Sequence, residues 1–132
     1  MTCPVCGGPT VAFAVPTDLR DHAPEGRAYA TLCSHCLRTH PAGGGPADPT
    51  FDAVHESFPS GEAGAALALA LGLLDSLALR RDDIDDCCSY AERAGADVLL
   101  TLDRLAAPAE ADDLDPHADI ERRRHQLAEM LR

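Results

Sequence analysis

The chain has 132 residues and a formal net charge of -11, and all eleven of its basic residues are arginines. A chain of this length forms one ordinary domain or two very small ones. With 23 alanines and an aromatic content of only 4%, leucine is the main bulky residue available for a core. The strong negative charge repels nucleic acids and anionic lipids, which excludes a broad basic binding surface.

The acidic, lysine-free composition is typical of proteins from a high-salt cytoplasm, where electrostatic screening is short-ranged. A high-GC coding bias, which also replaces lysine by arginine, is the alternative explanation. The amino terminus MTCPVCGG lacks the basic and apolar regions of a secretory signal. The longest apolar run, 63–74, is too short to cross a bilayer. We therefore expect a cytoplasmic protein without a membrane segment.

The charge is distributed unevenly along the chain. Residues 1–46 hold three acidic residues and three arginines, so the other 19 acidic residues and 8 arginines give residues 47–132 the whole charge of -11. The boundary falls in the sequence PAGGGP at 41–46, whose glycines and prolines are typical of a linker. We predict a zinc ribbon at 1–40, a Gly/Pro linker at 41–49 and an acidic helical domain at 50–132.

Two pairs of cysteines carry the strongest signal in the sequence. Cys3 and Cys6 form one CxxC motif, Cys33 and Cys36 form the other, and 26 residues separate them. A CxxC turn directs both sulfurs toward one point, and four such sulfurs match the closed tetrahedral coordination of structural zinc. The spacing predicts a zinc site with no open position for a catalytic water.

Four other interpretations of these cysteines stay open, and the simplest is that their spacing is accidental. Iron-binding rubredoxins also carry CPxCG, but they normally have a glycine after both knuckles, where this chain has Leu37 after the second. Thiol redox chemistry needs one exposed cysteine pair of low pKa. His35, inside the second knuckle, could replace a cysteine as ligand, whereas His22 and His40 are expected at the surface.

Short strands are predicted at 11–15 and 28–32, joined by a loop with one helical turn after Thr17. Apolar spacing and capping residues then predict five helices, at 50–57, 61–80, 82–95, 97–107 and 115–131, the last with Asp115 as N-cap. The helix at 61–80 is apolar on most sides, so the others should pack around it. The predicted fold class is α+β, a small four-cysteine zinc-ribbon β-hairpin followed by a mainly α-helical bundle of four to five helices.

Cys87 and Cys88 share an apolar helical stripe with Ile84 and Ala91, which favours core packing over a second metal site or a disulfide. Two sets of arginines are candidate contact residues. Arg20, Arg27 and Arg38 lie on the neutral half, and Arg122, Arg123 and Arg124 form the densest basic cluster, where pairing with neighbouring acidic helices is the simpler interpretation.

These features favour a non-enzymatic zinc-binding protein that uses its ribbon as a protein-interaction adaptor. The first alternative is a transcription- or RNA-associated factor, which requires Arg20, Arg27 and Arg38 to share one face. The second is a rubredoxin-like iron or thiol redox protein. The partner is expected to be another protein, nucleic acid is weakly supported, and the scarcity of large core residues is compatible with a homodimer.

The order of the motifs resembles an uncharacterised haloarchaeal family with an N-terminal CPxCG zinc ribbon and a helical C-terminal part. The resemblance rests on CPVCG at 3–7, VAFAVPTDLRDHAP at 11–24, CSHCLR at 33–38, FPSGEAGAALALALGLLDSLALR at 58–80, AERAGADVLLTLDRLA at 91–106 and RRRHQL at 122–127. It covers nearly the whole chain except the linker and residues 108–116. It implies a zinc-ribbon-like site at Cys3, Cys6, Cys33 and Cys36, and it implies no reaction.

Overall fold

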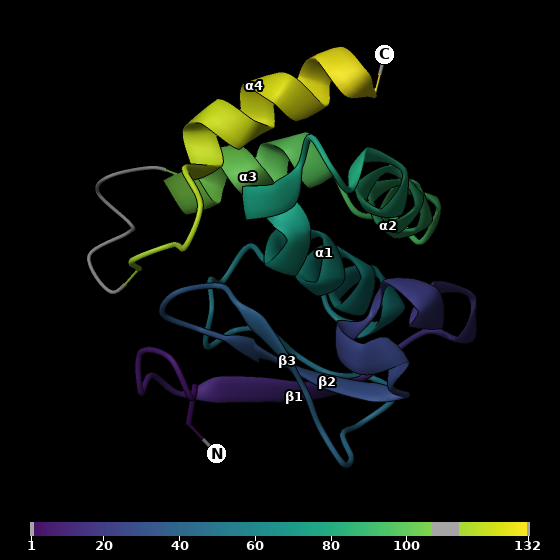
Figure 1. The fold of residues 1–132 in the computed structure, drawn as a ribbon, viewed down its shortest axis with the longest axis vertical. Coiled ribbons are helices and arrows are strands. Elements are labelled where there is room, and N and C mark those ends of the chain that lie inside the picture. The colour runs from purple at the N-terminus through teal and green to yellow at the C-terminus, as the bar shows by residue number, and fades with distance from the viewer. Residues whose placement is uncertain (1, 107–113, 132) are drawn as a thin grey trace.

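A small antiparallel sheet lies beneath a stack of helices (Figure 1). The computed structural model describes residues 2–106 and 114–131. Within these ranges the sheet has the order β1-β2-β3, and there are four α-helices. The bounds are β1 Thr10–Ala14, β2 Tyr29–Cys33, β3 Thr39–Pro41, α1 Gly61–Leu73, α2 Arg81–Arg93, α3 Val98–Ala106 and α4 Ile120–Met130. The predicted α+β class is confirmed.

The hairpin of β1 and β2 brings the two cysteine pairs to one end of the sheet. Its register places Thr10 opposite Cys33, so the chain leading from Cys6 into β1 lies beside the end of β2. Both strands match their predictions to within one residue. The third strand was not predicted, because only two residues precede its proline. Pro41 is tolerated there because β3 is an edge strand.

At the opposite end of the hairpin, two 3-10 helices connect β1 to β2. They are η1 (Thr17–His22), which confirms the predicted helical turn, and η2 (Pro24–Gly26). The expectation that His22 is a surface residue is wrong, because its side chain is only 12% exposed. Its ring nitrogens lie 2.8 Å from a carboxylate oxygen of Asp83 and 3.1 Å from one of Asp86, which ties η1 to α2.

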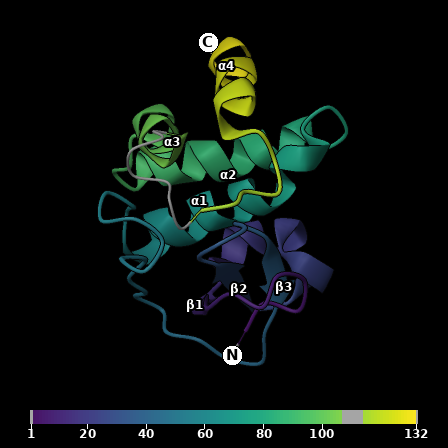
Figure 2. The same cartoon turned by 90° about the vertical axis from the view of Figure 1, so that its left-hand side faces the viewer.

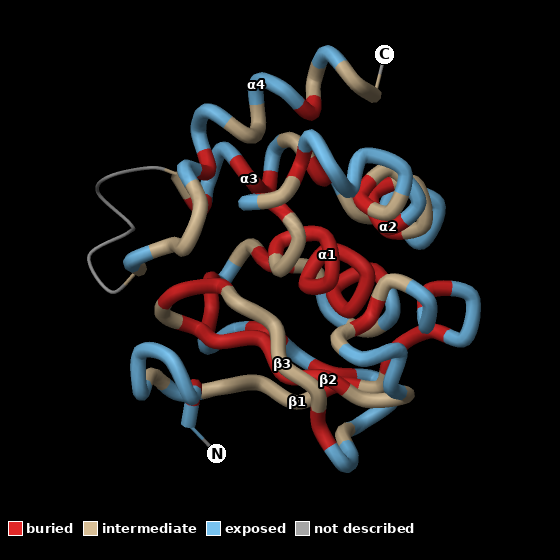
Figure 3. Tube along the Cα trace, in the orientation of Figure 1, coloured by how far each residue is buried: buried red, intermediate tan, exposed pale blue. Residues whose placement is uncertain are grey.

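Helix α1 is the centre of the molecule. All nine residues from 63 to 71 are buried, and Figure 3 shows this helix as a continuous buried segment between the sheet and the remaining helices. The approach to β3 is so close that a Cβ atom at Gly72 would lie 2.0 Å from Oγ1 of Thr39. Helix α4 lies on the side of α2 and α3 that faces away from the sheet (Figures 1 and 2).

Three helix predictions need correction. Residues 50–57 form turns rather than a helix, since the ring of His55 accepts the Ser57 N–H and so competes with the helical pattern. Helix α1 ends at Leu73, where the short 3-10 helix η3 (Leu74–Ser76) turns the chain toward α2. The last helix begins at Ile120 rather than near 115, and Asp119 is its N-cap, accepting the Arg122 N–H. Residue 107, the predicted end of the fourth helix, lies outside the described residues.

One hydrophobic core includes residues from both predicted parts of the chain. Phe13 and Leu32 from the sheet belong to the same cluster as Phe51, Leu67 and Leu127. The predicted linker is also tied to the sheet and to α1, because the Ala14 N–H donates to Pro46 and the Gly61 N–H to Pro49. In the described ranges, no helix has both the length and the apolar character needed to cross a membrane.

Candidate metal centre

Four cysteine sulfurs converge at the end of the hairpin. The Sγ atoms of Cys3, Cys6, Cys33 and Cys36 all lie within 4.8 Å of one another. Two of the pairs connect the knuckles, with 3.7 Å between the sulfurs of Cys3 and Cys36 and 3.4 Å between those of Cys6 and Cys33. The structure thus brings together all four predicted ligand residues.

This arrangement has the dimensions of a tetrahedral metal-thiolate site. Sulfurs bound to zinc at about 2.3 Å in a tetrahedron are separated by about 3.8 Å, close to the 3.7 Å between Cys3 and Cys36 and the 3.4 Å between Cys6 and Cys33. Cys3, Cys33 and Cys36 are buried, whereas Cys6 is exposed. The group can therefore hold a metal ion with one sulfur at the protein surface.

The two knuckles have the same backbone geometry. The N–H of Gly7 donates to the carbonyl of Cys3, and the N–H of Leu37 donates to that of Cys33, in each case from the residue that follows the second cysteine. Both residues have positive φ, +77° for Gly7 and +62° for Leu37. A left-handed leucine is strained by roughly 1–2 kcal/mol. Complete burial of the Leu37 side chain in the core offsets this cost.

Gly8 allows the first knuckle to lie against the second. A Cβ atom at this position would be 2.8 Å from Cβ of His35, 3.3 Å from Sγ of Cys33 and 3.4 Å from Sγ of Cys6. Real side chains essentially never approach to 2.8 Å, so a larger residue would force the knuckles apart. The glycine after CPVCG is therefore part of the site geometry.

Backbone N–H groups surround the sulfurs. Gly8 donates to Cys6 at 3.4 Å, and His35 and Cys36 each donate to Cys33 at 3.4 Å. Burial raises the pKa of the Cys33 thiol to about 12 despite these bonds, and the neighbouring thiols add to the increase. Burial also disfavours the Cys3 thiolate, but hydrogen bonds from Cys6, Val5, His40 and Cys36 lower the pKa of Cys3 to about 6.

Two cationic or proton-donating side chains lie against the pair formed by Cys3 and Cys36. Nε2 of His40 is 3.4 Å from Sγ of Cys3. The Arg38 guanidinium donates to the Cys36 sulfur, and this hydrogen bond raises the pKa of Arg38. Four thiolates around a divalent ion leave two negative charges, one of which the Arg38 guanidinium is placed to offset. His40 is half-buried on the edge strand β3, and nothing in its sequence context indicated its contact with Cys3.

The other candidate residues on the neutral half lie apart from Arg38. Arg27 precedes β2, whereas the Arg38 carbonyl accepts the N–H of Cys33 at the last residue of that strand. The five residues of β2 span about 16 Å. Arg20 lies in η1, at the same end as Arg27, whose Nε is 3.8 Å from Oε1 of Glu25. The three arginines thus do not form one compact patch. His35 is not among the ligands of the four-cysteine group.

The three arginines of the cluster on α4 differ in their contacts. Nε of Arg124 lies 2.8 Å from Oδ1 of Asp103, and its NH2 group donates to Oδ2, which links α4 to α3. Arg123 donates to the side chain of Gln126, whereas Arg122 is exposed. Pairing with an acidic residue of a neighbouring helix therefore accounts for Arg124.

Cys87 and Cys88 are core residues, as their helical stripe predicted. Both are completely buried, together with Ile84 and Ala91. Burial raises the pKa of both thiols, to about 12 for Cys88. They are not part of the metal-ligand group.

A contact that the sequence did not indicate joins the second knuckle to residues near α4. The N–H of Asp115 donates to the carbonyl of His35 at 2.8 Å, and the N–H of His117 donates to that of Cys36 at 2.9 Å. About 80 residues of sequence separate the donors from the acceptors, and the residue types at these positions do not predict that they pair. Only the folded chain reveals that this segment reaches the metal centre.

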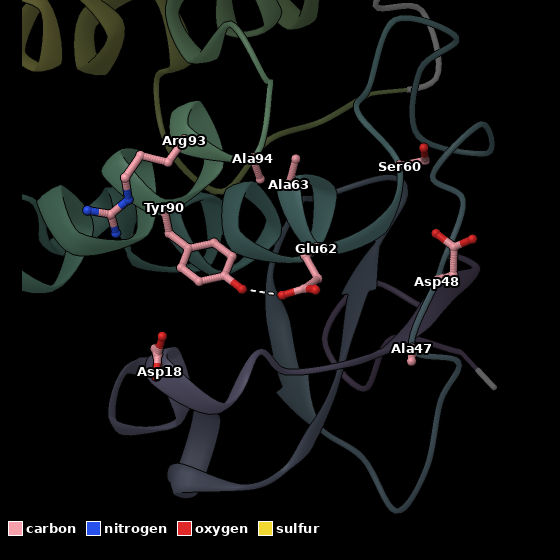
Figure 4. A pocket seen from close by; sticks show the side chains of 9 residues that line it. All are labelled: Asp18, Ala47, Asp48, Ser60, Glu62, Ala63, Tyr90, Arg93 and Ala94. Carbon is pink, nitrogen blue, oxygen red and sulfur yellow. Dashed lines mark hydrogen bonds between the residues drawn. The ribbon is translucent and has the colours of Figure 1, made fainter.

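A separate polar cavity of about 770 Å³ lies beside α1, α2 and η1. Asp18, Asp48, Glu62 and Arg93 are among its lining residues, and the Tyr90 hydroxyl donates to Glu62 (Figure 4). That hydrogen bond raises the pKa of Tyr90 to about 12, with burial as a further cause. None of the four clustered cysteines lines this cavity, so it is distinct from the candidate metal centre.

Comparison with known proteins identifies a protein-family model that matches the chain. A family model described as "Family of unknown function (DUF6276)" matches residues 2–131, which is nearly the whole chain. Neither a curated protein nor a solved structure matches the chain.

Proposed function

The chain belongs to the family of unknown function DUF6276, and we propose, from its cysteine cluster, that it is a zinc protein whose ribbon serves as a protein-interaction adaptor. The observation that carries this proposal is the convergence of four sulfurs within 4.8 Å of one another. Cys₄ sets of this size are typical of structural zinc, which binds thiolates tightly enough to stabilise small folds.

The proposed role of the metal is structural rather than catalytic. Four protein thiolates complete a tetrahedral shell and leave no position for a water or a substrate. Activation of a zinc-bound water requires such a position. The absence of an open ligand position supports a non-enzymatic role for this centre.

Metal analysis tests the first part of the proposal. Protein purified under reducing conditions should contain one zinc ion per chain, measured by mass spectrometry of the metal. Replacement of Cys33 by serine should abolish stoichiometric binding, whereas Cys88→Ala, a matched control in the core, should retain it. Iron with visible charge-transfer absorption would support the rubredoxin-like alternative instead, and no bound metal would overturn the proposal.

The exposed tip of the first knuckle supports the adaptor role. Pro4 and Cys6 are exposed, and Val5 is 60% exposed, so the tip presents an apolar residue to solvent. This tip belongs to the half of the chain with no net charge. We place the adaptor in a high-salt cytoplasm, where the acidic helical part keeps the molecule soluble.

Affinity purification from the native cytoplasm at native salt tests the adaptor role. The wild-type chain should retain a protein partner that Val5→Glu loses, while Leu79→Glu, at another exposed apolar residue, should retain it. Both variants add the same charge to an exposed apolar site, so the comparison isolates the knuckle tip. Retention of RNA rather than protein would favour the nucleic-acid alternative, and equal retention by all three chains would contradict the use of the tip.

A further inference from the structure

A short segment before α4 is docked on the candidate metal centre. We call residues 114–118 the C-terminal strap. Its residues Asp115 and His117 donate their N–H groups to the carbonyls of His35 and Cys36, at 2.8 Å and 2.9 Å. Two N–H groups of the strap, one on each side of Pro116, thus donate to successive carbonyls of the second knuckle. Both accepting carbonyls belong to the turn that carries two of the four sulfurs.

The side chain of His117 fixes the strap from its other side. The ring is only 2% exposed, and Nε2 lies 2.9 Å from the carbonyl oxygen of Leu71 near the end of α1. A carbonyl can only accept, so the proton of this bond is on Nε2. Nδ1 faces Asp75 at 3.5 Å. His117 therefore connects the second knuckle, through its own backbone, to the central helix.

The strap leads directly into α4. Leu114 and Ala118 pack against the hydrophobic core, and Asp119 caps the helix that begins at the buried residue Ile120. The position of the strap consequently determines where the first turn of α4 lies. A change at the second knuckle can reach α4 through the two backbone hydrogen bonds to the strap, which the buried ring of His117 holds against α1.

We propose that the C-terminal strap is a positioning element of the metal centre, so that metal binding orders the strap and the first turn of α4, and the docked strap in turn strengthens metal binding. This inference rests on the proposed metal site. The physical link is the turn from Cys33 to Cys36, because the ion fixes the two sulfurs and the same turn directs the carbonyls of His35 and Cys36 toward the strap. Coupling between two sites is reciprocal in binding free energy, so each effect requires the other.

Hydrogen exchange of the full-length reduced chain, with and without one equivalent of Zn²⁺, tests the first half of the coupling. The amides of Asp115 and His117 should gain protection by about tenfold, a typical size for coupled sites. The amides of Cys87 and Cys88 in the core of α2 serve as internal references for global stabilisation. Equal gains at the strap and at these references would overturn the coupling while leaving the proposed metal site intact. A chain that binds no Zn²⁺ would overturn both.

Two pairs of variants test the reciprocal half, with Co²⁺ as the probe because its charge-transfer and d–d bands report tetrahedral thiolate coordination. Asp115→Pro removes the N–H donor, whereas Asp115→Ala keeps it. Similarly, His117→Leu removes the ring donor, and His117→Gln can place an amide N–H near the same carbonyl. We expect the donor-deleting variants to bind Co²⁺ several-fold more weakly with unchanged bands, and the matched variants to stay near wild type. Equal Co²⁺ affinity across each pair would contradict the proposal.

Discussion

Nε2 of His40 lies 3.4 Å from Sγ of Cys3, and the two residues come from opposite ends of the ribbon sequence. Cys3 is buried in the first knuckle, whereas His40 lies in the edge strand β3. The sheet order places β3 beside β2, which carries Cys33 at its end. The third strand therefore supplies an outer contact to the metal centre that a two-stranded ribbon would lack.

His40→Phe should weaken metal binding while leaving the fold intact. The substitution removes the N–H that can donate to the Cys3 thiolate, and loss of such outer contacts typically lowers metal affinity by about 10- to 100-fold. Competition with a chromophoric zinc chelator measures the change. His125→Phe, at an exposed position of α4, is the control. Equal affinities for the two variants would show that His40 does not act on the centre.

Gly8→Ala should damage the centre more than the same change at an open glycine. The new Cβ would meet Cβ of His35 at 2.8 Å and the sulfurs of Cys33 and Cys6 at 3.3 Å and 3.4 Å. Relief of this contact requires the knuckles to separate, which lengthens the distances between sulfurs. We expect weaker Co²⁺ binding and altered charge-transfer bands. Gly43→Ala, where no atom lies within 4 Å of the added Cβ, should bind Co²⁺ as the wild type does.

Ionisation of the Cys88 thiol should lower the free energy of unfolding at alkaline pH. Burial raises its pKa from the ordinary 9.0 to about 12, so the folded protein holds the proton more tightly than the unfolded chain. The corresponding stabilisation is fully present below pH 9 and is lost as the pH rises through 12. Denaturant unfolding at several pH values should therefore show a smaller decline above pH 9 for Cys88→Ala than for the wild type.

Two controls accompany the alkaline measurement. Ser89→Ala lies on the same helix and removes no titrating thiol, so its decline with pH should match that of the wild type. Ellman's reagent should modify the exposed Cys6 of the metal-free chain long before Cys88, which is completely buried. Rapid modification of Cys88 in the folded chain would contradict both its burial and its raised pKa.

The sequence was most informative where local chemistry determines structure. CxxC turns fix the sulfur geometry within four residues, and the 3.6-residue apolar period places Ile84, Cys87 and Cys88 on one buried face. The hairpin strands followed from their short apolar runs. These features depend on neighbours in the chain, so they could be predicted to within one or two residues.

Features that depend on distant contacts could not be predicted. The end of α1 at Leu73 coincides with the close approach of Gly72 to Thr39 and with the bond from His117 to Leu71. Likewise, Asp115 has the sequence of an N-cap, but its N–H donates to His35 and the helix begins after Asp119 instead. In each case a tertiary partner outweighed a local preference that was itself correctly identified.

The ion pair with Asp103 distinguishes Arg124 from its exposed neighbour Arg122. Arg124→Gln removes a two-point contact between α4 and α3, in which both side chains are partly exposed. Such pairs contribute at most about 1 kcal/mol, and screening reduces the contribution at high salt. Thermal unfolding should therefore show a lower midpoint than wild type at about 0.1 M salt and a smaller difference at about 1 M, where the screening length is near 3 Å. Arg122→Gln makes the same chemical change at an exposed position, where no ion pair joins the guanidinium to an acidic side chain within residues 2–106 and 114–131. Its midpoint should stay at the wild-type value in both conditions. If Arg124→Gln lowers the unfolding midpoint equally at both salt concentrations, packing of the arginine side chain, rather than its charge, holds α4 on α3.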